Sequence, residues 1–343
     1  MFAQRLLDWH REHGRHDLPW QHPRSPYRVW VSEIMLQQTQ VATVIPYFLK
    51  FMARLPDLPT LAGASDDEVM ALWAGLGYYS RARNLHRSAQ ICVAQHNGDL
   101  PGRFDDLVAL PGIGRSTAGA ILAQAFDEPY PILDGNAKRV LARFHAVAGW
   151  PGKSTVLRAL WDLAEQTTPS HSAADYAQAI MDLGATVCTR QPACLICPLK
   201  EDCQGAAAGD PTRYPGRRPR KAIPLRKAFL CLVENEAGEV LLEKRPPRGI
   251  WGGLWSLPVE ESAVAGKVRF AAPFVHTFTH FKLELTPLRA GLGQLAVEDR
   301  QTQWVDPEEA LGQMGLPKPV RAFLTELQHG DIRWRPSPPP DCD

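Results

Sequence analysis

Apolar residues in the first two thirds of the chain recur at the spacing of one helix face. Within residues 39–55 the following positions share one side of a helix: Val41, Val44, Ile45, Phe48, Met52 and Leu55. Ser65 and Glu68 have the spacing of a capping box ahead of another helical stretch. We therefore expect residues 1–203 to be almost entirely helical.

A further helix is predicted after the glycine-rich segment that ends near Tyr78 and Tyr79. Its inward residues are expected to be Leu85, Ala89, Cys92 and Val93. Three arginines at positions 81, 83 and 87 lie near its start. They could contact phosphates, but a solvated helix face is the commoner explanation.

The pattern changes after residue 203. Residues 204–227 are rich in Gly, Pro and basic residues, which is typical of a linker that is solvated or that follows a polyanion. Period-two patterns then predict a hairpin around Glu236-Ala237-Gly238 and further strands, with two late helices. We predict a second domain at 228–333 and a disordered tail at 334–343.

Composition limits the possible classes of protein. A chain of 343 residues can form two domains, and 45% hydrophobic with 22% charged residues is ordinary for a globular protein. The net charge of +1 means that any basic surface for nucleic acid must be local. The N-terminus lacks an apolar signal-peptide core and no run is long enough to span a membrane, so we expect a soluble, cytoplasmic protein.

Residues 110–114, LPGIG, separate two helical patterns and predict a helix-hairpin-helix. Gly112 and Gly114 permit positive φ, so backbone N–H groups could face a phosphodiester at the start of the next helix. The alternative is a C-capping glycine followed by an ordinary turn.

Four of the seven cysteines lie within sixteen residues: Cys188, Cys194, Cys197 and Cys203. This spacing is typical of metal ligation and less so of a disulfide scaffold. Zinc and a four-iron cluster both use four thiolates, and the spacing alone does not separate them. Thiols without a metal are the third alternative.

Glu33 and Asp134 lie in sequence contexts that should have opposite effects on the charge of their carboxyl groups. Glu33 lies among apolar residues of a predicted helix, where desolvation should raise its pKa. Asp134 precedes a helical pattern, so it should cap a helix and remain an anion. A neutral acid beside an anion is the arrangement that cleaves glycosidic bonds. The alternatives are that Glu33 is a helix residue near the surface and that Asp134 is a purely structural N-cap.

Five motifs in order, SEIMLQQTQV, GLGYYSRARNL, LPGIGRSTAGAIL, ILDGNAKRV and MDLGATVCTR, make the chain resemble the MutY adenine DNA glycosylases, in the endonuclease III superfamily. The resemblance implies a multidomain fold. It comprises an all-α helix-hairpin-helix domain (21–130), an iron–sulfur helical domain (1–20 and 131–203) with one [4Fe-4S] cluster, and an α+β Nudix-like domain (228–333). The implied partner of the monomer is double-stranded DNA with adenine opposite 8-oxoguanine or guanine.

The resemblance also implies residue roles. Glu33 would protonate adenine and later activate water, while Asp134, assisted by Asn136, would stabilise the oxocarbenium ion. DNA contacts would come from Gln38, Tyr78, Gly112, Gly114 and Ser116. The adenine pocket would comprise Leu18, Trp20, Gln21, Gln178 and Met181. The 8-oxoguanine loop would be Phe278, Thr279 and His280.

The chain departs from the family pattern in places. Ser116 stands where bifunctional relatives carry a Schiff-base lysine, so we predict a monofunctional glycosylase. The segment after residue 258 lacks the Glu-rich magnesium helix of Nudix hydrolases, so pyrophosphohydrolysis is not expected. Thr279 replaces a serine, and five residues separate Cys188 from Cys194 where the family usually has six.

Two other functions are consistent with some of these features. A bifunctional glycosylase and lyase for oxidised pyrimidines would share the hairpin, but Ser116 and the C-terminal domain disfavour it. A DNA-scanning protein with a redox-active cluster and no catalysis would keep the hairpin and the cysteines. Glu33 and Asp134 argue against that class.

Overall fold

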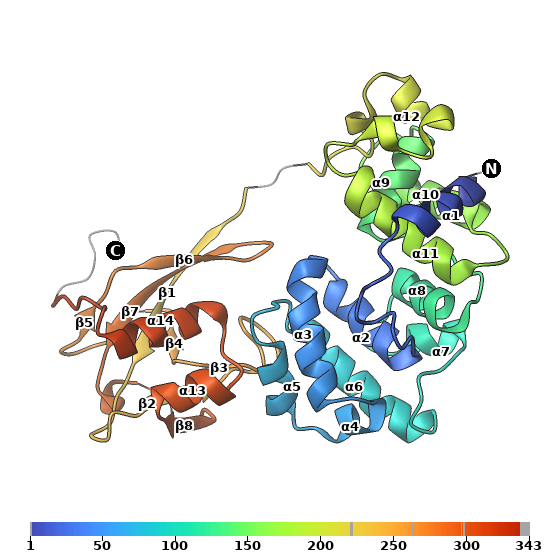
Figure 1. Cartoon of the computed structure of the whole chain (residues 1–343). Coiled ribbons are helices and arrows are strands. Elements are labelled where there is room, and N and C mark those ends of the chain that lie inside the picture. Colours follow the sequence, from blue (N-terminus) through green and yellow to red (C-terminus); the bar gives the residue numbers. More distant parts are fainter. Residues whose placement is uncertain (1, 220–221, 263, 296, 298, 337–343) are drawn as a thin grey trace. The chain divides into compact units, whose positions relative to one another are not determined.

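The computed structural model describes residues 2–219, 222–262, 264–295, 297 and 299–336. By its internal contacts the chain divides into two compact units (Figure 1). Unit 1 comprises Met1–Gly63 with Asn84–Arg220, and unit 2 comprises Ala64–Arg83 with Lys221–Asp343. The domain boundaries predicted above stay predictions, and most of the predicted disordered tail, 337–343, lies outside the described residues.

Unit 1 is built from helices, and the predicted helical character of residues 1–203 is confirmed. The α-helices are α1 (Phe2–His13), α2 (Pro26–Leu36), α3 (Val41–Arg54), α4 (Leu58–Gly63), most of α6 (Ser80–Gln95), α7 (Phe104–Ala109), α8 (Arg115–Phe126), α9 (Gly135–Phe144), α10 (Ser154–Thr167), α11 (Ala173–Asp182) and α12 (Gln204–Ala207). A π-helical turn, η1 (Leu183–Val187), follows α11, and the short 3-10 turns are η2 (Cys194–Ile196), η3 (Lys200–Asp202) and η4 (Pro211–Arg213).

The predicted apolar face of α3 is largely correct. Val44, Phe48, Met52 and Leu55 are buried, whereas Val41 and Ile45 are only partly so. In α6 the inward residues Leu85, Ala89 and Cys92 are confirmed, but the prediction for Val93 is wrong because its side chain is 46% exposed. It lies about 100° around the helix from Cys92, at the edge of the apolar stripe.

Unit 2 contains two sheets with helices beside them. The first sheet has the order β4-β1-β7-β5 with β6 also paired to β7, and the second has the order β3-β2-β8. β1 and β7 are parallel, and the other pairs are antiparallel. The elements are α5 (Asp66–Trp73), β1 (Leu225–Leu232), β2 (Val240–Lys244), β3 (Trp255–Ser256), β4 (Val259–Glu260), β5 (Arg269–Phe270), β6 (Phe274–Thr277), β7 (Lys282–Arg289), η5 (Leu292–Gln294), β8 (Thr302–Val305), α13 (Pro307–Gln313) and α14 (Lys318–His329).

The predicted hairpin of β1 and β2 is wrong beyond its turn. The turn forms as expected, with the backbone N–H of Gly238 donating to Asn235 and a single bridge between Glu234 and Val240. The two strands then separate into different sheets, because β1 pairs with β7 and β4 while β2 pairs with β3 and β8. Local sequence determined the turn, whereas strands distant in the chain decided the pairing.

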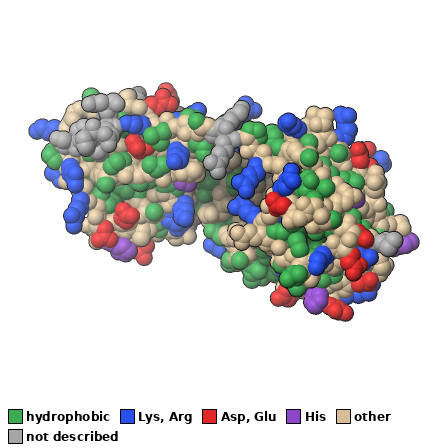
Figure 2. Space-filling model, turned by 90° about the horizontal axis from the view of Figure 1, so that it is seen from above, with side chains coloured by type: hydrophobic (Ala, Val, Ile, Leu, Met, Phe, Trp, Pro, Cys, Tyr) green, Lys and Arg blue, Asp and Glu red, His purple; other side chains and the backbone are tan. Residues whose placement is uncertain are grey.

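The first part of the predicted linker packs on unit 1. The backbone N–H of Gly216 donates to the carbonyl of Gly149 at 2.8 Å, and the guanidinium of Arg218 lies over the ring of Trp150 at 5.7 Å. The face in Figure 2 carries basic and acidic side chains together, in keeping with the net charge of +1. In the described part of the chain, no helix combines the length and apolar character needed to cross a membrane.

Candidate active site

Glu33 projects from α2 among buried apolar residues. The helix begins where Ser25 Oγ accepts the backbone N–H of Arg28 at 3.3 Å, followed by Pro26 in its first turn. Burial raises the pKa of Glu33 to about 7, the charge of Asp134 adds to this rise, and a hydrogen bond from Gln124 opposes it. The carboxyl is therefore poised to hold a proton near neutral pH.

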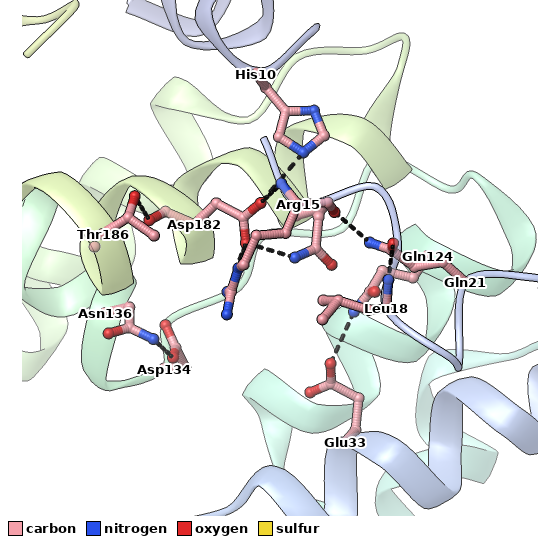
Figure 3. Close-up of polar contacts among 12 residues, drawn as sticks. His10, Arg15, Leu18, Gln21, Glu33, Gln124, Asp134, Asn136, Asp182 and Thr186 are labelled. Atoms are coloured by element: carbon pink, nitrogen blue, oxygen red, sulfur yellow. Dashed lines mark hydrogen bonds and ion pairs between the residues drawn. The ribbon is translucent and has the colours of Figure 1, made fainter. Parts of the chain in front are cut away.

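Asp134 is the N-cap of α9, as predicted. Its Oδ1 accepts the backbone N–H of Ala137 at 2.7 Å, and its Oδ2 accepts Nδ2 of Asn136 at 3.2 Å (Figure 3). These donors and the positive end of the α9 dipole favour the anion. The structure thus places an acid and a capped anion within electrostatic range of each other, since Asp134 affects the pKa of Glu33.

Helix α8 connects the two carboxyl-bearing elements. It packs on α2, and its Ser116 Oγ accepts the backbone N–H of Leu133 at 2.9 Å, just before Asp134. A Cβ atom on Gly119 would lie 2.4 Å from the carbonyl oxygen of Pro131, so glycine is needed for this close approach. Small residues in the hairpin motif therefore set the position of Asp134.

A hydrogen-bonded chain links Asp134 to the first cysteine, and sequence reasoning missed it. Arg139 Nη2 donates to Asn136 Oδ1 at 2.7 Å, and Arg139 Nε donates to the carbonyl of Cys188 at 2.7 Å. The side chain also donates to the carbonyl of Gly184 at 2.6 Å. Arg139 is in the quoted ILDGNAKRV motif, but a basic residue on a helix usually faces solvent, so the sequence did not indicate this role.

The four clustered cysteines form no disulfide among the described residues, and all four line one small pocket beside α9. Arg143 Nη1 donates to Cys188 Sγ at 3.3 Å, and Cys203 Sγ donates to the carbonyl of Arg143 at 3.5 Å. Four sulfur donors around one pocket fit a thiolate-bound metal group. Within the described residues, however, no three candidate ligands converge at metal-binding distances.

The residues expected around adenine gather in unit 1 from two regions. Leu18, Trp20, Gln21 and Gln178 are buried and Met181 is half-buried. The backbone N–H of Leu18 donates to Gln21 Oε1 at 3.1 Å, and Gln21 Nε2 donates to the carbonyl of Arg15 at 3.0 Å. Hydrogen bonds within the connection between α1 and α2 thus stabilise its conformation.

Asp182, which sequence reasoning missed, ties this connection to α11 (Figure 3). Its fully buried carboxylate accepts Gln178 Nε2 at 2.7 Å, the Arg15 backbone N–H at 2.7 Å and Arg15 Nη2 at 2.6 Å. His10 Nε2 lies 3.5 Å away. The available signal was its position four residues after Gln178, on the same helix face.

The hairpin glycines differ in conformation. Gly112 has a φ of +82°, which glycine permits, whereas Gly114 has a φ of −94° and is the N-cap of α8, so of the two only Gly112 uses the left-handed region. Among the described residues nothing lies within 4 Å of a Cβ built on Gly114. Its lack of a side chain therefore leaves the N-terminus of α8 accessible.

Gln38 and Tyr78 both have left-handed backbone conformations, with φ of 60° and 49°. Gln38 is exposed and the Tyr78 side chain is 43% exposed. Non-glycine residues held at positive φ store strain and cluster at functional sites. Neighbouring Arg81 is buried, with its guanidinium over the rings of Trp73 and Tyr78. It is therefore neither a phosphate contact nor part of a solvated helix face.

In unit 2 the loop after β6 exposes Thr279 and His280. Phe278 stacks on Phe281 with ring centroids 4.5 Å apart, which anchors the loop. The hydroxyl groups of Tyr78 and Thr279 lie 3.5 Å apart. A position that the resemblance implies as a DNA contact and one from the implied 8-oxoguanine loop are therefore neighbours within this unit.

Both parts of the chain resemble known proteins. The model of the HhH-GPD superfamily of base excision DNA repair proteins matches residues 31–166, and a NUDIX domain matches residues 229–326. The adenine DNA glycosylase of Buchnera aphidicola subsp. Acyrthosiphon pisum (strain APS) is 37% identical over 344 residues, covering 96% of this chain and 98% of the relative. That of Mus musculus is 40% identical, covering 75% of this chain and 60% of the relative. A solved structure of a thermostable thymine-DNA glycosylase matches with a TM-score of 0.54 at 26% identity, and the match covers 60% of this chain and 95% of that one.

The helical fold with its hairpin and the two family matches define a base-excision DNA repair enzyme of the helix-hairpin-helix superfamily, with a Nudix-like C-terminal domain. Within that class, the chain belongs to the adenine DNA glycosylase family. It removes adenine from DNA in base excision repair.

Proposed function

We propose that this glycosylase hydrolyses the N-glycosidic bond of adenine paired with 8-oxoguanine or guanine, with Glu33 as acid and Asp134 as anion. The observation that carries this proposal is the environment of Glu33, whose pKa is raised to about 7 by burial and by Asp134. A carboxyl that is neutral near pH 7 can protonate the leaving base, and an anion beside it stabilises the sugar cation.

The residues act in sequence. Glu33 gives its proton to the adenine ring, the C–N bond breaks, and the electron pair leaves with the base. Asp134, held by Ala137 N–H and by Asn136, stabilises the positive charge that develops on the deoxyribose. Glu33, now ionised, takes a proton from the water that adds to the sugar.

Binding must first expose the adenine. Gln38 and Tyr78 would enter the duplex as the base is flipped, and their strained, exposed loop positions support this role. The α8 N-terminus with Gly112, Gly114 and Ser116 would bind backbone phosphate. The flipped base would enter the pocket formed by the residues of the α1–α2 connection with Gln178 and Met181, and Phe278, Thr279 and His280 would inspect its partner.

Ser116 supports a monofunctional enzyme, because its hydroxyl accepts a backbone N–H and cannot form a Schiff base. The product would be an abasic site. The four cysteines would hold one [4Fe-4S] cluster with a structural role, and stoichiometric zinc in purified protein would overturn that assignment. We further propose a monomer that is cytoplasmic and associated with the nucleoid through DNA.

The test uses a duplex with one adenine opposite 8-oxoguanine, developed with and without alkali. We expect strand cleavage only after alkali, and Glu33→Gln should lower single-turnover excision at least about 100-fold while duplex affinity persists. Near-normal excision by Glu33→Gln from pH 6 to 8 would show that the acid is misassigned.

A further inference from the structure

Gln124 is a polar side chain on the buried face of α8. It is 4% exposed and its helix neighbours Ile121, Leu122 and Ala123 are buried apolar residues. A buried amide costs free energy unless it is hydrogen-bonded. Its Nε2 donates to Glu33 Oε1 at 2.8 Å across the packed α2 and α8 helices (Figure 3).

This hydrogen bond distinguishes the two oxygens of Glu33. An amide nitrogen only donates, so Oε1 serves as the acceptor and an acidic proton on Glu33 resides on Oε2. The bond also fixes the rotation of the carboxyl group about its last torsion, which is otherwise soft. A general acid works only when its proton is directed at the atom that receives it.

We propose that Gln124 is a positioning residue for catalysis: by holding Oε1 of Glu33, it directs the transferable proton on Oε2 toward the base and stabilises the carboxylate that remains after transfer. This inference rests on the proposed role of Glu33 as the acid. Gln124 itself does not touch the reacting atoms in this assignment.

The effect of losing Gln124 on the pKa of Glu33 depends on the charged groups carried by the neighbouring elements. Asp134 faces it from the start of α9 and raises its pKa. On α3, Lys50 and Arg54 are exposed to solvent, and on α8, Arg115 pairs with Glu165 at the opposite end from Gln124. Arg15, in the α1–α2 connection, is paired with Asp182.

The hydrogen bond from Gln124 is the contact that opposes the rise in the pKa of Glu33. Removing it therefore leaves burial and the charge of Asp134 uncompensated, and the pKa moves further upward. Because excision requires protonated Glu33, the rate falls as pH rises through this pKa. The alkaline limb of the rate profile should accordingly move to higher pH in the absence of the donor.

The decisive variant is Gln124→Met in the full chain, which removes the donor at similar volume. Single-turnover excision on the adenine and 8-oxoguanine duplex is measured from pH 5.5 to 9. We expect the alkaline limb to shift upward by about one pH unit, with a lower limiting rate from lost orientation. Gln90→Met, at a half-buried glutamine that contacts His86 on α6, is the matched control and should leave the limb in place.

Gln124→Glu is the second variant, and it serves if the methionine variant does not fold. It puts a second carboxyl against Glu33, and the pair should share a proton, shifting the limb further than Gln124→Met does. A folded Gln124 variant with an unchanged limb would overturn the proposal, because a purely structural role lowers the rate without moving the profile. If Glu33→Gln retains excision, the acid assignment itself fails, which is a separate result.

Discussion

Glu33 and Asp134 carry the same functional group, and their surroundings give it opposite tasks. Apolar helix packing around Glu33 penalises its charge, whereas the α9 N-terminus around Asp134 supplies two donors to it. The two sites are also coupled, since the charge of Asp134 adds to the rise in the pKa of Glu33. At the residue scale, the chemistry depends on this contrast more than on either side chain alone.

The raised pKa of Glu33 predicts a cost to stability. Between pH 4.5, the ordinary pKa of a glutamate, and about 7, folded protein binds more protons at Glu33 than unfolded protein does. Glu33 should therefore stabilise the fold less as pH rises through this window, by about 3 kcal/mol in total. Glu33→Gln does not titrate, so its denaturant midpoint should improve relative to wild type between pH 4.5 and 8. An equal pH response of both proteins would contradict this.

Helix α9 and the π-helical turn η1 approach each other closely at the element scale. A Cβ atom on Gly184 would lie 2.6 Å from Asn136 Cβ and 3.0 Å from its Cα. Arg139 spans the same contact by binding the carbonyls of Gly184 and Cys188. The spacing of these two elements therefore fixes Asn136, and through it Asp134.

We predict that Gly184→Ala forces α9 and η1 apart. Overpacking of this kind costs about 1–3 kcal/mol of stability, and displacement of Asn136 should lower excision at least about 10-fold. Unfolding curves and single-turnover rates measure the two effects. Gly312→Ala in α13 is the control, because a Cβ there has no described neighbour within 4 Å and should be tolerated. Equal rates for both variants would show that this contact does not position Asn136.

At the scale of the whole molecule, excision and partner inspection are assigned to different units. The carboxyls, the cysteines and the predicted adenine pocket lie in unit 1, whereas Tyr78 and the Phe278–His280 loop lie in unit 2. Segment Ala64–Arg83 belongs to unit 2, where Trp255 Nε1 donates to Asp67 Oδ1 at 3.1 Å. Removing the C-terminal domain would also remove these contacts of segment 64–83. Point variants therefore test selectivity with less structural disturbance than truncation does.

Thr279→Ala should reduce the preference for adenine opposite 8-oxoguanine over adenine opposite guanine. Loss of one hydrogen bond to the partner base corresponds to about a 5- to 10-fold change. Single-turnover rates and affinities on both duplexes give the ratio. Thr277→Ala, at an exposed threonine on β6, should leave the ratio unchanged. The same loss on both duplexes would mean that Thr279 supports folding or general binding instead of selectivity.

Residues that act through local backbone structure could be identified from the sequence. The Asp134 cap, the Ser65 cap, the positive φ of Gly112 and the helical periodicity of α3 all depend on neighbours within a few positions. The apolar neighbours of Glu33 along its own helix are local in the same sense, and they could be identified from the sequence. The sequence thus determined the two carboxyls and the class of chemistry.

Only the tertiary structure decided which distant side chains hold those residues in place. Gln124 on Glu33, Asp182 on Arg15 and Arg139 on Asn136 are hydrogen bonds whose meaning depends on how helices pack, and helical periodicity does not encode such packing. The separation of β1 and β2 into different sheets has the same origin, since pairing energy comes from strands far along the chain. The chain itself supplied the reactive groups, and three-dimensional packing determined their orientation and their proton affinity.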